Sequence, residues 1–452
     1  MPFIPNTDAD RQKMLERIGV KNFDELIEAI PQELRLKADL NLPSAISEFE
    51  AIKLLKNYAS KNVSIETHSC FIGGGAYDHF TPSIVGSIIE RPEFKTSYTP
   101  YQAEVSQGTL QSIYEYQSMI CQLTGMDISN ASLYDGGMAF AEAALLASKK
   151  TNRKEIICAG TINPHYIDTS KTLNDGANLI YKNIISADGT CDLEQLAKTV
   201  NENTAAVFVQ QPNFLGNLED VIEIEKIAHS HKAVFVAVVN PMTLGLLEAP
   251  ANYNADIVIG DGQSLGLPLN FGGPYLGIFA CKNEFSRLMP GRVVGVTQDL
   301  EGKRGFVLTL QTREQHIRRE KATSNICTNQ GLYMLAATVY MATMGKEGIK
   351  EVAEQSMLKA HYLAENIAKI PGFRINDAKP FFNEFLVETD SNIIKMSHSE
   401  IIEKAIEKNI LAGLCTCKYK DSGVKSGILV AVTEKRTKEE MDAFVDFLKT
   451  IA

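Results

Sequence analysis

Between residues 155 and 280 the sequence alternates short apolar runs with amphipathic stretches, and this alternation constrains the fold more than any other feature. The predicted strands are residues 155–159, 179–181, 205–210, 233–239, 257–259 and 275–280. Near-continuous apolar strands separated by helices indicate an α/β domain whose mostly parallel sheet is covered on both faces. Ligands bind such sheets at the carboxyl ends of the strands.

Three polar loops follow predicted strands of this sheet, so their side chains should share one rim. They are residues 210–213, residues 240–243 and residues 260–266. The last loop is rich in glycine, leads to a turn at Gly272-Gly273-Pro274 and enters the next predicted strand at Tyr275. We therefore expect the chemistry of the domain at this rim.

The chain has 452 residues, which is too long for one hydrophobic core and suits two or three domains. We expect a helical arm in residues 1–65, a large α/β domain in residues 66–325, and connecting helices with a small α+β domain in residues 326–452. Ser44, Ser399 and Thr437 are the predicted N-caps of helices in the first and last parts. The arm carries no recognisable chemistry, which favours a role in packing or oligomerisation.

Charge and hydropathy exclude several classes of protein. The net charge of -10 argues against general nucleic-acid binding, which needs basic surfaces. The longest apolar run, residues 233–239, is far shorter than the roughly 20 residues that cross a bilayer. The first residues also lack the basic start and apolar stretch of a signal peptide. We therefore expect a cytoplasmic protein that binds small molecules or another protein.

The eight cysteines are scattered along the chain, a pattern that favours buried free thiols in a reducing compartment. Cys415 and Cys417 could instead form half of a metal site, but nothing nearby completes a tetrahedron. The histidines do not cluster. We therefore expect no metal.

Four segments outside these strands have the composition of a binding site, and each also has a plainer interpretation. Residues 71–82 and 98–108 combine glycines, tyrosines and prolines, as site walls and packed surface loops both do. The pair Gly136-Gly137 before an alanine-rich helix either seats an anion or simply starts that helix. Residues 311–328 are rich in arginine, which can grip a phosphate or carboxylate or lie on a solvated helix face.

Four motifs together give the chain a likeness to a known family. They are YTPYQAEVSQG at residues 98–108, DGQSLG at 261–266, QTREQHIRREK at 311–321 and SNIC at 324–327. With these motifs in this order, the chain resembles the P-protein family of the glycine cleavage system essentially end to end. Within that family it is similar to the first subunit of the two-subunit glycine decarboxylases.

The resemblance implies a fold-type-I pyridoxal phosphate (PLP) transferase-like architecture, with a seven-stranded sheet, and a role in glycine decarboxylation. In that family glycine forms a Schiff base with PLP, CO2 leaves, and the aminomethyl group passes to the lipoyl arm of the H-protein. The position of the Schiff-base lysine is matched here by Gln263, and the position of the acid opposite the pyridine nitrogen by Asn240. Neither side chain can do the corresponding work.

We therefore expect this chain to be the subunit without covalently bound PLP, paired with a homologous subunit that carries the cofactor. Its own contribution would be walls of the partner's site. The expected wall residues are Tyr98, Tyr101, Gln107, Arg313, His316, Arg318, Thr323, Ser324 and Asn325.

Two alternatives stay open at this point. The chain could be a scaffold that docks the H-protein without touching the chemistry, or a self-sufficient PLP enzyme with an unrecognised lysine. Lys232 and Lys282 are candidates for that lysine, but their places beside strands predict that neither lies at the rim.

Overall fold

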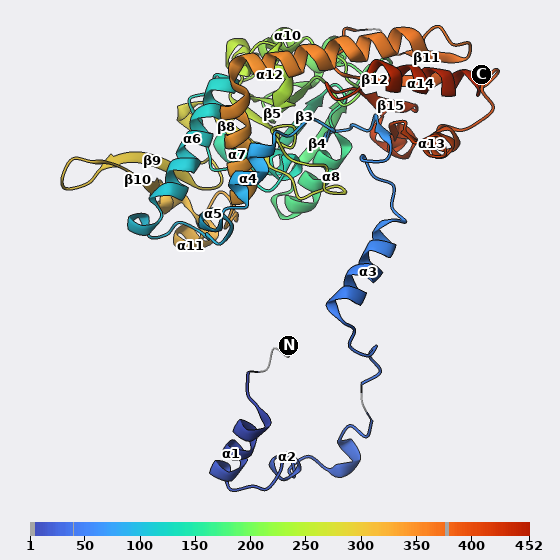
Figure 1. Cartoon of the computed structure of the whole chain (residues 1–452). Coiled ribbons are helices and arrows are strands. Elements are labelled where there is room, and N and C mark those ends of the chain that lie inside the picture. The colour runs from blue at the N-terminus through green and yellow to red at the C-terminus, as the bar shows by residue number, and fades with distance from the viewer. Residues whose placement is uncertain (1–4, 39, 376–378) are drawn as a thin grey trace. The chain divides into compact units, whose positions relative to one another are not determined.

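The computed structural model describes residues 5–38, 40–375 and 379–452 (Figure 1). The chain divides into two units, Met1–Val63 and Ser64–Ala452. The first unit falls two residues short of the predicted arm. Its helical segments are α1 (Asp8–Ile18), α2 (Phe23–Leu26), η1 (Gln32–Leu34) and α3 (Glu48–Ala59).

A seven-stranded sheet forms the centre of the second unit, which confirms the predicted sheet. In spatial order its strands are β2 (Ile128–Ser129), β8 (Gly277–Cys281), β7 (Ile257–Asp261), β6 (Val234–Val239), β5 (Thr204–Gln211), β3 (Glu155–Ala159) and β4 (Ile180–Ile184). The five strands from β7 to β4 are parallel, whereas β8 and β2 run antiparallel to their neighbours. The two-residue strand β2 was not among the predicted strands.

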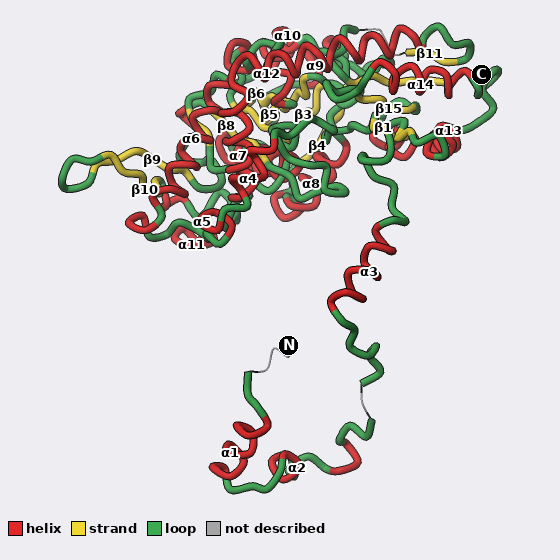
Figure 2. Tube along the Cα trace, in the orientation of Figure 1, coloured by secondary structure: helices red, strands yellow, loops and turns green. Residues whose placement is uncertain are grey.

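Helices cover both faces of this sheet (Figure 2). Successive side chains of each strand point to opposite faces, so each central strand contributes to two hydrophobic cores. Val207 and Val209 pack with the helices of one face, and Ala206 and Phe208 with those of the other. The first face is covered by α6 (Gln107–Thr124), α9 (Leu193–Thr199), α10 (Val221–Ser230) and α12 (Gly331–Ile367). The second face is covered by α7 (Gly136–Thr151) and α8 (Pro164–Leu173).

A smaller α+β part follows α12 and has its own core. Its antiparallel sheet contains, in order, β11 (Phe373–Ile375), β12 (Glu384–Thr389), β15 (Ile428–Ala431) and β14 (Leu414–Cys415). Two helices, α13 (His398–Ile406) and α14 (Lys438–Lys449), belong to the same part. The short strand β1 (Ser69–Cys70) pairs with β13 (Ile410–Leu411), so the segment that enters the large domain is tied to the C-terminal part.

A two-stranded antiparallel hairpin lies outside both sheets, formed by β9 (Val293–Gln298) and β10 (Arg304–Thr309) (Figure 1). The second unit also contains the short helices α4 (Ser83–Ile89), α5 (Pro92–Lys95) and α11 (Gln315–Arg318). Gln107 on α6 bonds the main chain of Phe306 on β10 in both directions, at 2.9 Å each way. The base of the hairpin is therefore fixed to the body of the domain.

Two predicted N-caps are wrong, and both errors have the same cause. Ser47 caps α3 instead of Ser44, and Ser397 caps α13 instead of Ser399. Each true cap is followed three residues later by a glutamate that bonds back to it, and this reciprocal capping box decides between neighbouring serines. Thr437 caps α14 as predicted.

The prediction of free thiols is wrong for one pair of cysteines. Cys415 and Cys417 form a disulfide, because a two-residue spacing brings their Cα atoms to 5.5 Å, within disulfide reach. The other six cysteines are free, and Cys70, Cys158 and Cys281 are buried. Among the described residues no group of three or more His, Cys, Asp or Glu side chains could hold a metal ion. None of the described helices is long and apolar enough to cross a membrane.

Candidate functional site

The polar loops after β5, β6 and β7 lie at one rim of the sheet, as the strand pattern predicts. Gln210 and Asn240, at the ends of β5 and β6, line the same small cavity. Tyr77, from the segment of residues 71–82, and Glu384, from the C-terminal part, complete its wall. The cavity has a volume of about 20 Å³, room for about one water molecule. This rim is therefore filled by the chain's own side chains.

The lysine position of the rim loop holds Gln263, whose side chain is fully buried. Its amide nitrogen donates to the carbonyl of Tyr77 at 3.0 Å and to that of Leu267 at 2.8 Å. Its amide oxygen accepts the backbone N–H of Tyr77 at 2.8 Å. Both amide hydrogens and the oxygen are thus used. A lysine has donors only and could not accept the Tyr77 N–H.

Tyr77 is anchored a second time by its hydroxyl, which donates to Glu384 on β12 at 2.9 Å. The other carboxylate oxygen of Glu384 accepts the N–H of Gly74 at 2.6 Å. Burial raises the pKa of Glu384 to about 7, although both hydrogen bonds act in the opposite direction. The segment of residues 71–82 is therefore clamped between the rim loop and the C-terminal part.

The predicted anion seat at the start of α7 is occupied by a side chain of this protein. Asp261, the last residue of β7, accepts the N–H of Gly136 at 3.0 Å and the N–H of Gln263 at 2.9 Å. Burial raises the pKa of Asp261 to about 7. A Cβ atom added at Gly136 would lie 2.4 Å from the Tyr166 hydroxyl, so there is no spare room beside this N-terminus.

Asn240, at the acid position, binds its own loop. Its side-chain oxygen accepts the N–H of Met242 at 3.1 Å and the hydroxyl of Ser264 at 3.2 Å. It thereby caps the short 3-10 helix η4 (Pro241–Gly245) and joins that helix to the rim loop. These are ordinary structural roles of an amide at a helix start.

The nine predicted wall residues lie in two segments, and they differ in whether their side chains bond other parts of the fold. Gln107, Arg313 and Ser324 serve the fold: Gln107 holds the hairpin, Arg313 donates to the carbonyls of Met289 and Gly291, and the Ser324 hydroxyl accepts the N–H of Ile326. The other six are exposed or half-buried: Tyr98, Tyr101, His316, Arg318, Thr323 and Asn325.

Helix α7 fixes the second of these segments. The ammonium group of Lys149 donates to the carbonyls of Ala322 at 2.7 Å and Thr323 at 3.0 Å. Glu142 lies on the same helix, and burial raises its pKa to about 7, while a hydrogen bond with the Ser324 side chain opposes that rise. Helix α7 therefore fixes the position of residues 322–324, and the N-terminus of the same helix is bonded by Asp261.

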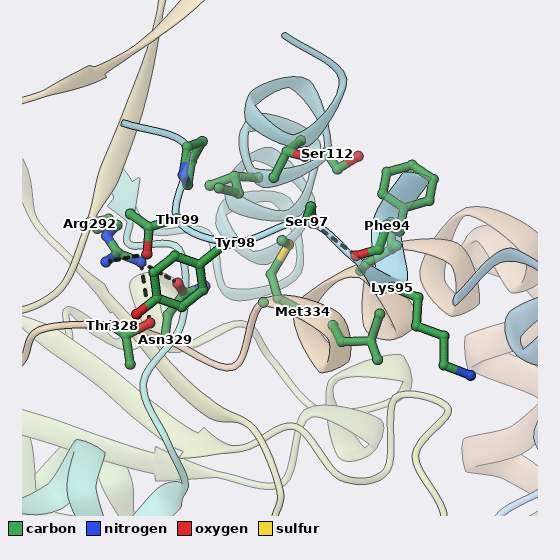
Figure 3. Close-up of a pocket in the computed structure, with 16 residues that line it drawn as sticks. Phe94, Lys95, Ser97, Tyr98, Thr99, Ser112, Arg292, Thr328, Asn329 and Met334 are labelled. Atoms are coloured by element: carbon green, nitrogen blue, oxygen red, sulfur yellow. Dashed lines mark hydrogen bonds between the residues drawn. The ribbon is translucent and has the colours of Figure 1, made fainter. Parts of the chain in front are cut away.

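The two wall segments meet at Arg292, a residue that the sequence analysis missed. The guanidinium of Arg292 donates to the hydroxyl of Thr99 at 3.0 Å and to the side-chain oxygen of Asn329 at 3.1 Å (Figure 3). It also donates to the carbonyl of Cys327 at 2.7 Å. Only the arrangement Pro290-Gly291-Arg292 before an apolar strand could have drawn attention to it, since it places one cation at a strand entrance.

Comparison with known families identifies the chain. The sequence profile of the family described as "Glycine cleavage system P-protein" matches residues 1–448. The chain belongs to this family. A relative of this P-protein chain from Chloroherpeton thalassium, named "Probable glycine dehydrogenase (decarboxylating) subunit 1", is 52% identical over 451 residues, which cover 100% of both chains. The name "subunit 1" implies a second subunit.

Solved structures agree with this assignment. The crystal structure of a glycine decarboxylase (P-protein) of the glycine cleavage system, in inhibitor-bound form, has 39% identity and a TM-score of 0.89, and the match covers 100% of both chains. A cysteine desulfurase of Escherichia coli matches with a TM-score of 0.62 at 13% identity, covering 86% of this chain and 95% of that one, which shows the fold alone. The predicted fold-type-I architecture is confirmed.

Neither alternative lysine of this P-protein chain lies at the rim. Lys282 follows β8, which runs antiparallel to β7, so it lies at the amino end of the parallel strands. Its ammonium group is bound there to Asp256 at 2.7 Å and to the side chain of Asn254 at 2.8 Å. Lys232 precedes β6 and is exposed at the same edge.

Proposed function

We propose that this chain is the cofactor-free subunit of a two-subunit glycine decarboxylase. The second subunit, of the same fold, holds PLP, and the assembled pair decarboxylates glycine and passes the aminomethyl group to the lipoyl arm of the H-protein. The family assignment and the name of its relatives as subunit 1 support this. PLP, where it is bound, supplies the electron sink that lets CO2 leave.

The observation that carries the proposal is the bonding of Gln263. PLP needs a lysine amine at this position, and an amide nitrogen is not a nucleophile. The Gln263 amide also has no free hydrogen-bonding capacity, since it is spent on Tyr77 and Leu267. The residues at this rim do not fit the cofactor, and we derive no step of the reaction through it in this chain.

Charge at the start of α7 argues in the same direction. A cofactor phosphate would have to replace the Asp261 carboxylate at the N–H of Gly136 or lie beside it. Two anions in a buried site repel each other strongly, and the raised pKa of Asp261 already reflects the cost of one. Asn240 is neutral and cannot favour a protonated pyridine nitrogen as a carboxylate would.

What this chain offers to the second subunit is an exposed wall. We propose that Tyr98, Tyr101, His316, Arg318, Thr323 and Asn325 reach the partner's site, and that Gln107, Arg313 and Ser324 position them. Hydroxyls and cations on a fixed surface can orient the carboxylate of glycine and exclude water from it. The complex would act in the cytoplasm.

Enzyme assays with separately purified chains test the proposal. Glycine-dependent CO2 release in the presence of lipoylated H-protein is expected from the mixture of both subunits and from neither alone. Activity of this chain alone with PLP would contradict the proposal. The scaffold alternative predicts that Tyr101→Ala and Arg318→Ala leave glycine turnover in the mixture unchanged, whereas the wall assignment predicts a higher KM for glycine or a lower kcat.

A further inference from the structure

A second cavity, separate from the filled rim, lies where the two wall segments meet. Its volume is about 220 Å³, and both polar and apolar side chains line it. Ser112 and Ile113 on α6 form one side, and Met334 and Leu335 on α12 form another (Figure 3). Unlike the rim, this cavity has room for a small solute.

Arg292 brings an uncompensated charge to this cavity. Its side chain lies in the cavity wall and the residue is only 4% exposed. All of its hydrogen-bond acceptors in the described part of the chain are neutral, and no carboxylate there comes within 4.0 Å. Taking a charge out of water is costly unless an opposite charge compensates it.

Another arginine of the same chain shows what compensation looks like. Arg436 is also 4% exposed, but its guanidinium pairs with Asp78 and with Glu440, each at 3.1 Å. Arg313 is half-buried and donates to two carbonyls, but it does not line this cavity. Arg292 therefore differs from both in combining a buried unpaired charge with open space.

The start of α12 adds partial positive charge to the same cavity. Gly331 and Leu332, its first two residues, line the cavity wall. Gln330 precedes them and makes no side-chain cap, and the first turn has no acidic residue. The dipole of a helix favours an anion at its N-terminus, where the N–H groups lack partners within the helix. Thr99 and Thr328 provide hydroxyls in the same wall.

The other groups that interact with Arg292 or line the cavity do not neutralise its positive charge. Lys95 contributes to its lining, but its ammonium group is paired with Glu90 and extends away from Arg292 (Figure 3). Arg292 stacks over the ring of Tyr101, with 5.8 Å between the guanidinium carbon and the ring centroid. The ring covers one side of the guanidinium with its negative face, which is a weak substitute for an anion.

We propose that this cavity is an oxyanion-binding site, in which Arg292 and the start of α12 hold a carboxylate or phosphate group. The terminal N–H groups of Arg292 all bond neutral oxygens, and the longest of these bonds is the one to the Thr328 hydroxyl at 3.4 Å. An oxyanion that replaces this acceptor gives the guanidinium a charged partner. That this chain binds an oxyanion here does not rest on the proposed function, whereas the identity of that oxyanion in the assembled enzyme does. Within the assembled enzyme, the oxyanion would come from the carboxylate of glycine or from the phosphate of the partner's cofactor.

Calorimetric titration of the purified full-length chain tests the site. Inorganic phosphate, acetate and glycine are titrated separately at constant ionic strength, set with chloride. Saturable 1:1 binding of phosphate or of the carboxylates is expected, and competition between the two classes would place them in one site. Tighter binding of phosphate would assign the site to the phosphate of the partner's cofactor, and tighter binding of acetate and glycine would assign it to the carboxylate of glycine. Absence of saturable binding by all three probes overturns the proposal.

Two variants of different kinds are compared with a control. Arg292→Gln removes the charge, and Ser112→Phe fills the cavity while it leaves Arg292 in place. Each should weaken the Kd by at least about tenfold, as expected for the loss of charged hydrogen bonds or of the binding space. Arg287→Gln changes an exposed arginine outside the cavity and should bind like the unchanged protein. If Arg292→Gln fails to fold, Ser112→Phe decides. Binding of unchanged strength in the folded variants overturns the proposal.

Discussion

The side-chain amide of Gln263 bonds both backbone groups of Tyr77, donating to its carbonyl at 3.0 Å and accepting its N–H at 2.8 Å. One residue of the segment 71–82 is thereby bonded through both of its main-chain polar groups, as a neighbouring strand would bond it. The pair explains why this rim has no open pocket: the place where a related enzyme would present a lysine is instead used to fasten the chain to itself.

Replacement of Gln263 by lysine should not create a cofactor site. The lysine would leave the Tyr77 N–H buried without an acceptor, so Gln263→Lys should lower the free energy of unfolding by about 2–4 kcal/mol. With PLP added, it should develop no visible absorbance that borohydride fixes to the chain. Gln122→Lys makes the same chemical change at an exposed position of α6 and should alter stability by less than about 0.5 kcal/mol. A stable Gln263→Lys protein with covalently reducible PLP would contradict the filled-rim account.

Glu384 should make stability depend on pH. Its pKa is raised by burial from the ordinary 4.5 to about 7, so between these values the folded protein holds a proton that the unfolded chain has lost. Folding stability due to this group is therefore complete below about pH 4.5, falls as pH rises to about 7, and is then constant.

Glu384→Gln removes this titration and preserves the shape of the side chain. The variant's free energy of unfolding, relative to that of the unchanged protein, should rise by on the order of 3 kcal/mol between about pH 5 and about pH 8. Urea unfolding at a series of pH values measures the difference. A difference independent of pH would mean that Glu384 ionises normally despite its burial.

Arg313 should contribute to the stability of the fold and not directly to glycine binding. Its guanidinium binds the carbonyls of Met289 and Gly291, so Arg313→Ala should cost about 3 kcal/mol of unfolding free energy, because two buried carbonyls lose their donor. Arg318→Ala, an exposed neighbour, should change it by less than about 0.5 kcal/mol. Arg313→Ala with unchanged stability and a raised KM for glycine would make Arg313 a direct wall residue.

The N-terminal arm should serve association. Helix α3 buries none of its residues, and its stripe of Phe49, Ile52, Leu55 and Tyr58 is 47–76% exposed. Exposed apolar stripes of this kind mark protein interfaces. Deletion of residues 1–63 should weaken binding to the second subunit by at least about tenfold, measured by sedimentation of mixtures.

The deletion should leave the remainder folded, because residues 64–452 have their own cores. Its circular dichroism and thermal unfolding provide the control. Phe49→Ser gives a milder test of the same stripe in the full-length chain. Unchanged association of both proteins would remove the arm from the interface.

Local patterns were enough to predict most of the large domain. Five of the seven central strands, β3 and β5 to β8, are mostly buried apolar runs, and their order along the chain led to the parallel sheet. The edge strand β4 is largely exposed and was predicted from its first apolar residues alone. The two-residue strands β1 and β2 escaped prediction, because each is defined by pairing with a strand that is more than a hundred positions away in the sequence: Ser69 with Ile410, and Ile128 with Cys281. No local periodicity records such pairings.

The candidate site could likewise be predicted from the sequence only in part. Gln263 and Asn240 could be located in the sequence because each follows an apolar strand at a fixed place in a motif. What fills the rim could not: Tyr77 lies 186 residues from Gln263 in the chain and Glu384 lies 307 residues from Tyr77. Arg292 was missed because only the folded structure shows that it is buried beside a cavity without a charged partner.

The central claim is that PLP in the assembled enzyme belongs to the second subunit and not to this chain. Reduction of the active two-subunit complex with borohydride, followed by the mass of each separated chain and of its peptides, tests it most directly. The account predicts the added mass of reduced cofactor on a lysine of the second subunit and an unmodified mass for this chain. Reduced cofactor on any lysine of this chain would contradict it.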